Sequence, residues 1–213
     1  MSSIADVKDK LFDPLTPEVD EIWGDIPVLC REAGEKMREV ILSAASDGDS
    51  VGGVLETAVV GLPVGIGEPW FDTVEGLLAK AMFSIPAVKG VEFGAGFGIS
   101  EMRGSMANDP FRSENGKVVT SKNNSGGING GITNGMPVIF RTAVKPTPSI
   151  YKEQNTVNVE SLDNRTLTIE GRHDPCIVHR ARVVVEAMTA ITVADLLVGR
   201  FGTDWLSTDA EKA

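Results

Sequence analysis

The chain has 213 residues, a formal net charge of −10 and an apolar fraction of 42%. This length allows one or two domains with a sizeable core, and the composition excludes an intrinsically disordered chain. The acidic balance argues against nucleic-acid binding, which needs clustered Lys and Arg. The charge is −8 for residues 1–60 and −2 for residues 61–213, so the longer part can still hold a local cationic site.

The ends and the cysteines indicate a cytoplasmic protein without membrane contact. The first residues show no basic region followed by an apolar stretch, so no signal peptide is expected. Apolar runs stay well short of the ~20 residues that span a bilayer. Cys30 and Cys176 lie far apart in the sequence and do not form a disulfide framework.

Hydrophobic periodicity and turn residues predict helices and strands in mixed order. In the first part of the chain we expect a helix at 27–46, a turn at 47–50, a strand at 51–60, a loop at 61–69, a helix at 71–83 and a strand at 88–93. The middle part is expected to form a helical turn at 100–106, a flexible polar excursion at 108–124 and a glycine-rich segment at 125–135. A strand at 137–144, strands within 156–170 around a turn at 163–164, and a helix at 179–200 follow. This order favours the α+β class over a regular βαβ array. We expect one domain at 1–206 and a disordered acidic tail at 207–213.

Glycine is enriched, with 23 residues against the usual share of about 7%. The Gly94–Gly98 segment follows a predicted strand, but a dinucleotide-binding fingerprint would need its third glycine at Ile99. A tight turn with positive φ angles fits these glycines better. The segment 125–135 holds two Gly-Gly pairs, each followed by Ile. Either the backbone approaches a flat or anionic ligand there, or two chain segments cross closely; both explanations remain open.

Two polar segments are candidates for binding an anion. At 145–149 two prolines fix the backbone around Thr147, which would present Lys145, Thr147 and Ser149 to phosphate or flavin oxygens. The alternative is a simple terminator of an edge strand. The second segment places Arg172 and Arg180 around the start of the last helix, where the helix dipole favours anions.

The same second segment allows two other chemistries. His173, Cys176 and His179 have the spacing of zinc ligands, although no other Cys or His cluster supplies a fourth ligand. Cys176 could also act as a nucleophile with His179 as its base, but no oxyanion-stabilising loop accompanies them.

Taken together, these segments resemble the chorismate synthase family in their order and spacing. The matching segments are 61–69, 84–92, 125–135, 145–149, 171–176 and 186–188. The resemblance runs from about Pro27 to the last helix and corresponds to the C-terminal half to two-thirds of a family chain. It implies a partial β-α-β sandwich, with long helices between antiparallel sheets, and assembly as a homotetramer.

The resemblance also implies a reaction and its residues. The family converts 5-enolpyruvylshikimate 3-phosphate to chorismate by an anti-1,4-elimination of phosphate that requires reduced FMN. Carried over by position, the residues that would line FMN are Pro86, Ala87, Gly130, Lys145, Pro146, Thr147, Pro148, Ser149 and Arg172. Arg172 and Asp174 would also face the substrate, and Asp174 would either tune the N5 region of the flavin or assist the proton relay. No metal is implied.

One departure from the family limits this expectation. The Ser-His-Gly motif and the general-acid histidines of the family are missing, and His173 and His179 match neither of those histidines. We therefore expect an N-terminally truncated chain with little or no activity by itself. The alternatives are a non-catalytic remnant that binds flavin or pairs with a full-length or complementary subunit, and a small metal-binding module.

Overall fold

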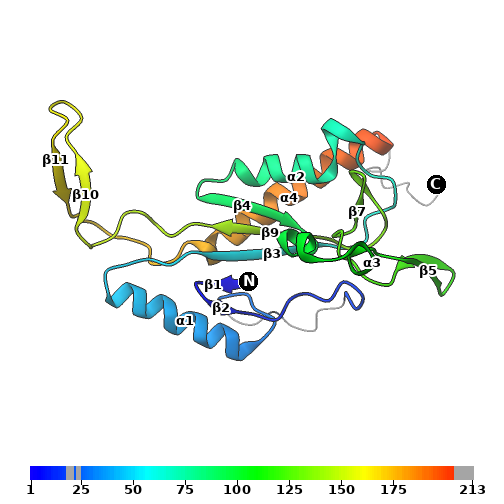
Figure 1. Ribbon diagram of the computed structural model, residues 1–213, viewed down its shortest axis with the longest axis horizontal. Coiled ribbons are helices and arrows are strands. Elements are labelled where there is room, and N and C mark those ends of the chain that lie inside the picture. Colours follow the sequence, from blue (N-terminus) through cyan, green and yellow to red (C-terminus); the bar gives the residue numbers. More distant parts are fainter. Residues whose placement is uncertain (18–21, 23–24, 204–213) are drawn as a thin grey trace.

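A computed structural model describes residues 1–17, 22 and 25–203 of the chain (Figure 1). The expected tail at 207–213 lies outside these residues. The elements in order are β1 (Ser3–Ile4), β2 (Val7–Lys8), α1 (Arg31–Ser46), β3 (Gly53–Val59), η1 (Trp70–Asp72), α2 (Val74–Phe83), β4 (Val88–Phe93), η2 (Gly96–Glu101), α3 (Gly104–Ala107), β5 (Phe111–Glu114), β6 (Lys117–Thr120), β7 (Ile128–Asn129), β8 (Ile132–Thr133), β9 (Val138–Val144), β10 (Gln154–Val157), β11 (Asn164–Leu167) and α4 (Val178–Phe201).

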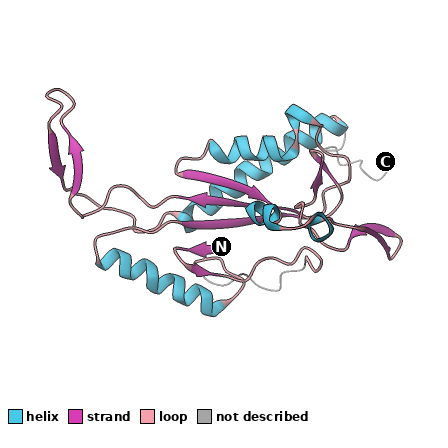
Figure 2. Cartoon of the chain, in the orientation of Figure 1, coloured by secondary structure: helices cyan, strands magenta, loops and turns pink. Residues whose placement is uncertain are grey.

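A five-stranded sheet in the order β2-β1-β3-β9-β4 forms the centre of the fold. All its strand pairs are antiparallel, and β3 pairs with β9 from Gly53 opposite Val144 to Val59 opposite Val138. Helices α2 and α4 lie on one side of the sheet and α1 on the other (Figures 1 and 2). This mixture of helices and antiparallel strands confirms the α+β class.

The core lies between the sheet and the pair α2–α4. Alternate side chains of β9 point into it, as the two-residue period of a strand requires. The buried residues of this row are Val138, Phe140, Thr142 and Val144. The three apolar residues of this row belong with Leu78 and Met82 of α2 and Val185 of α4 to one hydrophobic cluster. Burial of these apolar side chains is what fixes the two helices against the sheet.

Arg141, one of the three intervening residues of β9, holds three strands together through ion pairs. Its Nε lies 2.6 Å from Glu92 of β4, and its Nη1 lies 3.5 Å from Glu56 of β3. Its Nη2 also donates to the Gly94 carbonyl at 2.9 Å. These three side chains are only 9–29% exposed, so loss of one partner would leave a poorly solvated charge.

The helix predicted at 27–46 begins four residues later than expected, at Arg31. The reason is Asp9, whose carboxylate accepts hydrogen bonds from the backbone N–H groups of Leu29 and Cys30 at 2.7 and 2.9 Å. These bonds hold the chain before the helix in an extended conformation, with Cys30 at φ −121° and ψ 119°. The short strands β1 and β2 beside this segment were not predicted.

The helix predicted at 71–83 begins at Val74 because Thr73 caps it. The Thr73 hydroxyl accepts a hydrogen bond from the Gly76 N–H at 2.9 Å, which satisfies one of the free donors of the first turn. The residues before the cap, Trp70–Asp72, form a separate 3₁₀ turn.

The prediction of a flexible excursion at 108–124 is wrong. Residues Phe111–Glu114 and Lys117–Thr120 form the hairpin β5–β6. Its turn residues Asn115 and Gly116 have φ angles of +53° and +76°, the conformation for which Asn-Gly is favoured.

The strands predicted within 156–170 form a long hairpin arm, β10–β11, which projects from the body (Figure 1). Its turn differs from the prediction because Asn164 already pairs with Val157. The Asn158 side chain accepts from the N–H groups of Glu160 and Ser161 and closes the turn earlier. In the described residues, no helix is long and apolar enough to cross a membrane.

Candidate functional site

Three of the predicted segments meet at one end of the central sheet. The segment 145–149 leaves the C-terminal end of β9, and Ala87 precedes the adjacent start of β4. Lys145 donates its backbone N–H to the Ala87 carbonyl at 2.9 Å, so these segments are joined directly. The segment 171–176 reaches the same end through the loop that precedes β3. There Ser50 bonds to Thr147 at 2.6 Å, and Val51 bonds to Pro175 at 2.8 Å.

This end carries two cations and an unsatisfied hydroxyl. Lys145 and Arg172 are both exposed, and no ion pair involves them among the described residues. The Thr147 Oγ1 atom is buried and has no hydrogen-bond partner within the part of the chain that the structure describes. A buried hydroxyl without a partner is unfavourable, so a ligand with polar or anionic oxygens would suit this position.

Asp174 is held at the entrance of α4. One carboxylate oxygen accepts from Arg180 Nη1 at 2.8 Å, and the other accepts from the Cys176 N–H at 3.3 Å. The Asp174 side chain remains 27% exposed, while Arg180 is largely in solvent. The carboxylate therefore has a fixed orientation and retains access to a ligand.

The structure does not favour the other two chemistries of this segment. Cys176 is fully buried, and burial together with the Asp174 charge raises the pKa of its thiol. A thiol that stays protonated is a poor nucleophile. Among the described residues, no group of three or more Cys, His, Asp or Glu side chains comes together as a metal would require.

The glycine segments divide into two kinds. Gly94 and Gly126 cross backbone to backbone, which is the close crossing that the sequence left open. Gly131 is likewise packed, since an added Cβ would lie 2.7 Å from the Glu68 carbonyl. Gly130, at φ +59°, has no atom within 4 Å of such a Cβ and therefore faces open space. This openness is compatible with a ligand, but the position differs from that of the other predicted residues.

Gly130 lies at the opposite end of the sheet from Lys145. The ribbon β7–β8 that contains it precedes Val138, whereas Lys145 follows Val144, and seven strand residues cover roughly 20 Å. Figure 1 shows β7 on the right and the root of the arm on the left. The structure thus brings together Ala87, 145–149 and 171–174 but does not join Gly130 to them. Gly130 as a cofactor contact stays a prediction.

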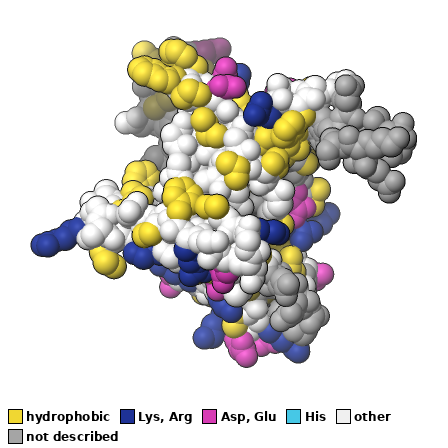
Figure 3. All heavy atoms as spheres, turned by 90° about the vertical axis from the view of Figure 1, so that its right-hand side faces the viewer, with side chains coloured by type: hydrophobic (Ala, Val, Ile, Leu, Met, Phe, Trp, Pro, Cys, Tyr) yellow, Lys and Arg dark blue, Asp and Glu magenta, His cyan; other side chains and the backbone are white. Residues whose placement is uncertain are grey.

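The Gly130 end also exposes several large apolar side chains. Glu68 donates its N–H to Asp72 of η1, and Gly131 accepts from Val74, so η1 lies beside the ribbon. Within η1, Phe71 is 92% exposed. Figure 3 faces this side of the molecule and shows hydrophobic side chains scattered over its surface.

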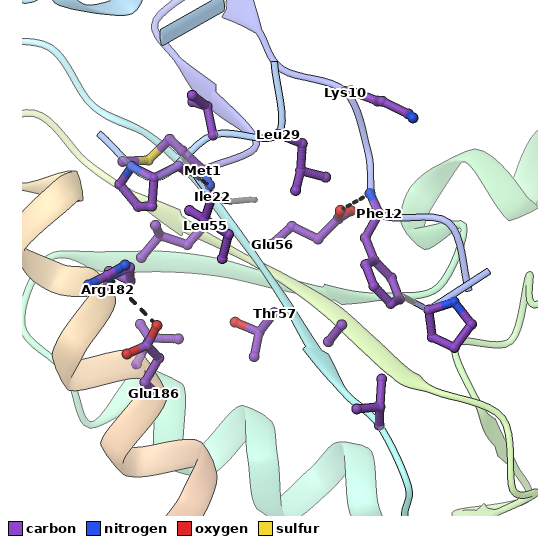
Figure 4. A pocket seen from close by; sticks show the side chains of 16 residues that line it. Met1, Lys10, Phe12, Ile22, Leu29, Leu55, Glu56, Thr57, Arg182 and Glu186 are labelled. Atoms are coloured by element: carbon purple, nitrogen blue, oxygen red, sulfur yellow. Dashed lines mark hydrogen bonds and ion pairs between the residues drawn. The ribbon is translucent and has the colours of Figure 1, made fainter. Parts of the chain in front are cut away.

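Two of the cavities in the structure border β3. One, of about 370 Å³, adjoins the candidate site and is lined by Ser50, Gly52 and Pro146 among others. The other, of about 320 Å³, lies between the N-terminal segment, β3 and α4 (Figure 4). In that cavity Arg182 and Glu186 project from α4 and pair at 3.6 Å. None of the predicted site residues lines this second cavity, so it is separate from the candidate site.

Sequence reasoning missed the residues that connect the site segments. Ser50 and Val51 belong to a stretch that was interpreted only as a turn followed by a strand. Tyr151 was not singled out, yet its hydroxyl donates to the Gly171 carbonyl and its ring packs edge-on against His173 at 4.7 Å. These contacts link positions far apart in the sequence, so no local pattern indicated them.

Comparison with known proteins gives consistent results. The family model described as chorismate synthase matches residues 3–198. The chorismate synthase of Dehalococcoides mccartyi is 60% identical over 164 residues, which are 77% of this chain and 45% of that protein. The chorismate synthase of Thermococcus gammatolerans is 51% identical over 185 residues, covering 86% of this chain and 52% of that protein.

A solved structure is similar as well. A crystal structure of chorismate synthase matches with a TM-score of 0.66 and 35% identity, covering 82% of this chain and 45% of that chain. The chain spans about half the length of the curated relatives it matches. Since the match extends over residues 3–198 and is accompanied by high identity, this chain belongs to the chorismate synthase family.

Proposed function

We propose that the chain takes part in chorismate synthesis, the anti-1,4-elimination of phosphate from 5-enolpyruvylshikimate 3-phosphate with the aid of reduced FMN. The observation that carries the proposal is the site at the end of the sheet, where exposed Lys145 and Arg172 accompany the unsatisfied hydroxyl of Thr147. Membership of the family supplies the reaction class. The reaction would take place in the cytoplasm, and assembly as a homotetramer follows the family pattern.

The residues at this end suit a flavin phosphate and its polar ring edge. Pro86, Ala87, the segment 145–149 and Arg172 would hold FMN, because they combine two cations, a free hydroxyl donor and a backbone made rigid by proline. Reduced FMN, when bound, supplies electron density for the departure of phosphate. Arg172 would also attract the anionic substrate.

Asp174 would serve the proton that leaves the substrate ring. Its carboxylate is oriented by Arg180 and by the Cys176 N–H, and it keeps partial access to solvent. A carboxylate that is fixed and accessible can accept or pass on a proton.

Replacement of Arg172 tests the proposal without depending on turnover. We expect Arg172→Ala to weaken FMN binding about tenfold or more, since a charge-assisted hydrogen bond contributes about 1.5–3 kcal/mol. The measurement is a flavin titration followed by absorbance and fluorescence under anaerobic conditions. Arg112→Ala is the matched control, because Arg112 is an exposed arginine of the β5–β6 hairpin. Equal affinities of both variants and the wild type would contradict the assignment of Arg172.

As a second candidate function, the chain is a subunit whose site is completed by a separate polypeptide that carries the remaining part of a chorismate synthase. The exposed surface of α4 favours it. This helix turns a continuous apolar stripe to the surface, formed by Val183, Val184, Ala187, Ala190, Ile191 and Ala194. On α1, by contrast, the exposed surface carries six charged side chains, namely Arg31, Glu32, Glu35, Lys36, Arg38 and Glu39. An exposed apolar stripe along a helix is typical of a surface that packs against another element or partner.

The proposed occupant of the α4 stripe is the part of a family chain outside the region matched here. We expect this chain to form a stable complex when it is co-expressed with the unmatched part of the Dehalococcoides mccartyi enzyme. Turnover of 5-enolpyruvylshikimate 3-phosphate with photoreduced FMN should appear in the complex and be absent from the chain alone.

Two variants, at side chains that are equally exposed in the wild type, test whether the α4 stripe forms the contact. Ile191→Glu on α4 is expected to abolish the complex, because it places a charge in the apolar stripe. Leu42→Glu on α1 should leave the complex intact, although Leu42 and Ile191 are both 62% exposed. A homodimer in place of the complex, or normal turnover by the chain alone, would exclude this candidate.

A further inference from the structure

We infer that the loop 47–51, between α1 and β3, positions the candidate site and that Ser50 is its principal positioning residue. This inference rests on the proposed function only for the identity of the ligand. The supporting contacts connect this loop to the segments 145–149 and 171–176, which no strand pairing of the sheet joins to each other.

The loop has a defined conformation. Helix α1 ends at Ser46, and the N–H groups of Gly48 and Asp49 donate to the carbonyls of Ala45 and Ala44 at 3.2 and 2.9 Å. Gly48 adopts φ +66°, which turns the chain away from the helix. The Asp49 carboxylate accepts from the Ser50 N–H at 2.8 Å, so the backbone of Ser50 is fixed independently of the contacts of its side chain.

Two consecutive residues of the loop hold the two candidate segments. The Ser50 hydroxyl donates to the Thr147 carbonyl at 2.6 Å, across 97 positions of sequence. The Val51 N–H donates to the Pro175 carbonyl at 2.8 Å. Pro146 and Pro148 lack N–H groups, so the segment around Thr147 has few backbone donors of its own. The spacing between Thr147 and the Arg172–Asp174 region is therefore set by adjacent residues of one loop.

The same loop also fixes the root of the β10–β11 arm. The Tyr151 N–H donates to the Gly48 carbonyl at 2.9 Å, and Lys152 Nζ lies 2.8 Å from Asp49. Hydrogen bonds to Asp47 and Asp49 raise the pKa of Lys152, and the bond to Lys152 lowers the pKa of Asp49 from its ordinary 3.8. Both groups thus remain charged throughout the neutral range.

The directions of the two pKa shifts define the pH range in which the ion pair between Lys152 and Asp49 is present. The contribution of Asp49 is complete above pH 3.8 and is lost as the pH falls through its lowered pKa. The contribution of Lys152 is complete below pH 10.5 and is lost as the pH rises through its raised pKa. The arm root is consequently held in the same way between about pH 4 and pH 10.

Removal of the Ser50 hydroxyl should loosen one segment without unfolding the protein. The Thr147 carbonyl would lose its donor, while Lys145 would keep its backbone bond to Ala87. Thr147 and Ser149 would remain in the site but would no longer be held in a fixed position. We expect FMN affinity to fall about tenfold, the change that corresponds to about 1.4 kcal/mol.

The experiment compares Ser50→Ala, Ser50→Thr and Ser100→Ala with the wild type. Ser100→Ala is the matched control, because the Ser100 hydroxyl also donates to a backbone carbonyl, that of Phe97 at 2.7 Å, in η2, which follows the other end of β4. FMN titration measures the ligand, hydrogen–deuterium exchange reports on peptides covering 145–149 and 171–176, and thermal unfolding checks the fold. Ser50→Ala should speed exchange at 145–149 and weaken FMN binding, with a melting temperature close to that of the wild type.

The variants separate this inference from the proposed function. If the wild type does not bind FMN, the proposed function fails, and hydrogen exchange alone then decides the inference. Ser50→Thr retains a hydroxyl and should restore slow exchange and FMN affinity to within about twofold of the wild type. Unchanged exchange at 145–149 in Ser50→Ala would overturn the inference, as would a Ser50→Thr variant that behaves like Ser50→Ala.

Discussion

Phe140→Ala is expected to lower the free energy of unfolding by about 3–5 kcal/mol, the usual cost of truncating a buried phenylalanine. Phe140 lies at the centre of β9 with no exposed surface. Its ring packs against Phe93 of the neighbouring strand with the ring centres 5.7 Å apart. The cavity left by the ring would lie between the sheet and both helices of the core, so β9 cannot collapse to fill it.

Chemical denaturation in urea, followed by circular dichroism, measures this loss. Phe97→Ala is the matched control, because the Phe97 side chain is 83% exposed and should change stability by less than about 0.5 kcal/mol. A loss below about 1.5 kcal/mol for Phe140→Ala would mean that the core relaxes around the missing ring, contrary to the close packing described here.

Elements whose own residues carry the periodic signal could be predicted from the sequence. The strand at 88–93 and the helix at 179–200 occur within one residue of their predicted bounds. Boundaries shifted where a distant side chain intervened, as Asp9 does at Leu29 and Cys30 before α1. Strands of two residues, such as Ser3–Ile4, are too short for any periodicity, and only pairing with β3 creates them.

The site shows the same division between local and distant information. The residues of 145–149 and 171–174 could be singled out because their composition is unusual for a strand end and a helix start. Their meeting depends on Ser50 and Val51, which are ordinary turn and strand residues in the sequence. Gly130 shows the converse, since its motif is as distinctive as the others and yet it lies at the far end of the sheet.

The crossing of Gly94 and Gly126 explains part of the glycine excess in terms of packing. Gly94 adopts φ +55°, and a Cβ added there would lie 2.1 Å from the Asn124 carbonyl oxygen and 2.4 Å from the Gly126 nitrogen. These neighbours are backbone atoms of a segment bonded to β9, because Ile139 donates its N–H to the Gly126 carbonyl. Neither of the two crossing segments can move aside without breaking hydrogen bonds of the sheet.

Gly94→Ala is therefore expected to cost about 3–5 kcal/mol, which combines the strain of a left-handed alanine with the overlap of two backbones. Gly61→Ala separates the two effects, since Gly61 has φ +78° and no atom within 4 Å of an added Cβ. That control should lose only about 1–2 kcal/mol in the same urea titration. If the two variants were equally destabilised, the close crossing would contribute nothing, and conformational freedom alone would account for glycine at position 94.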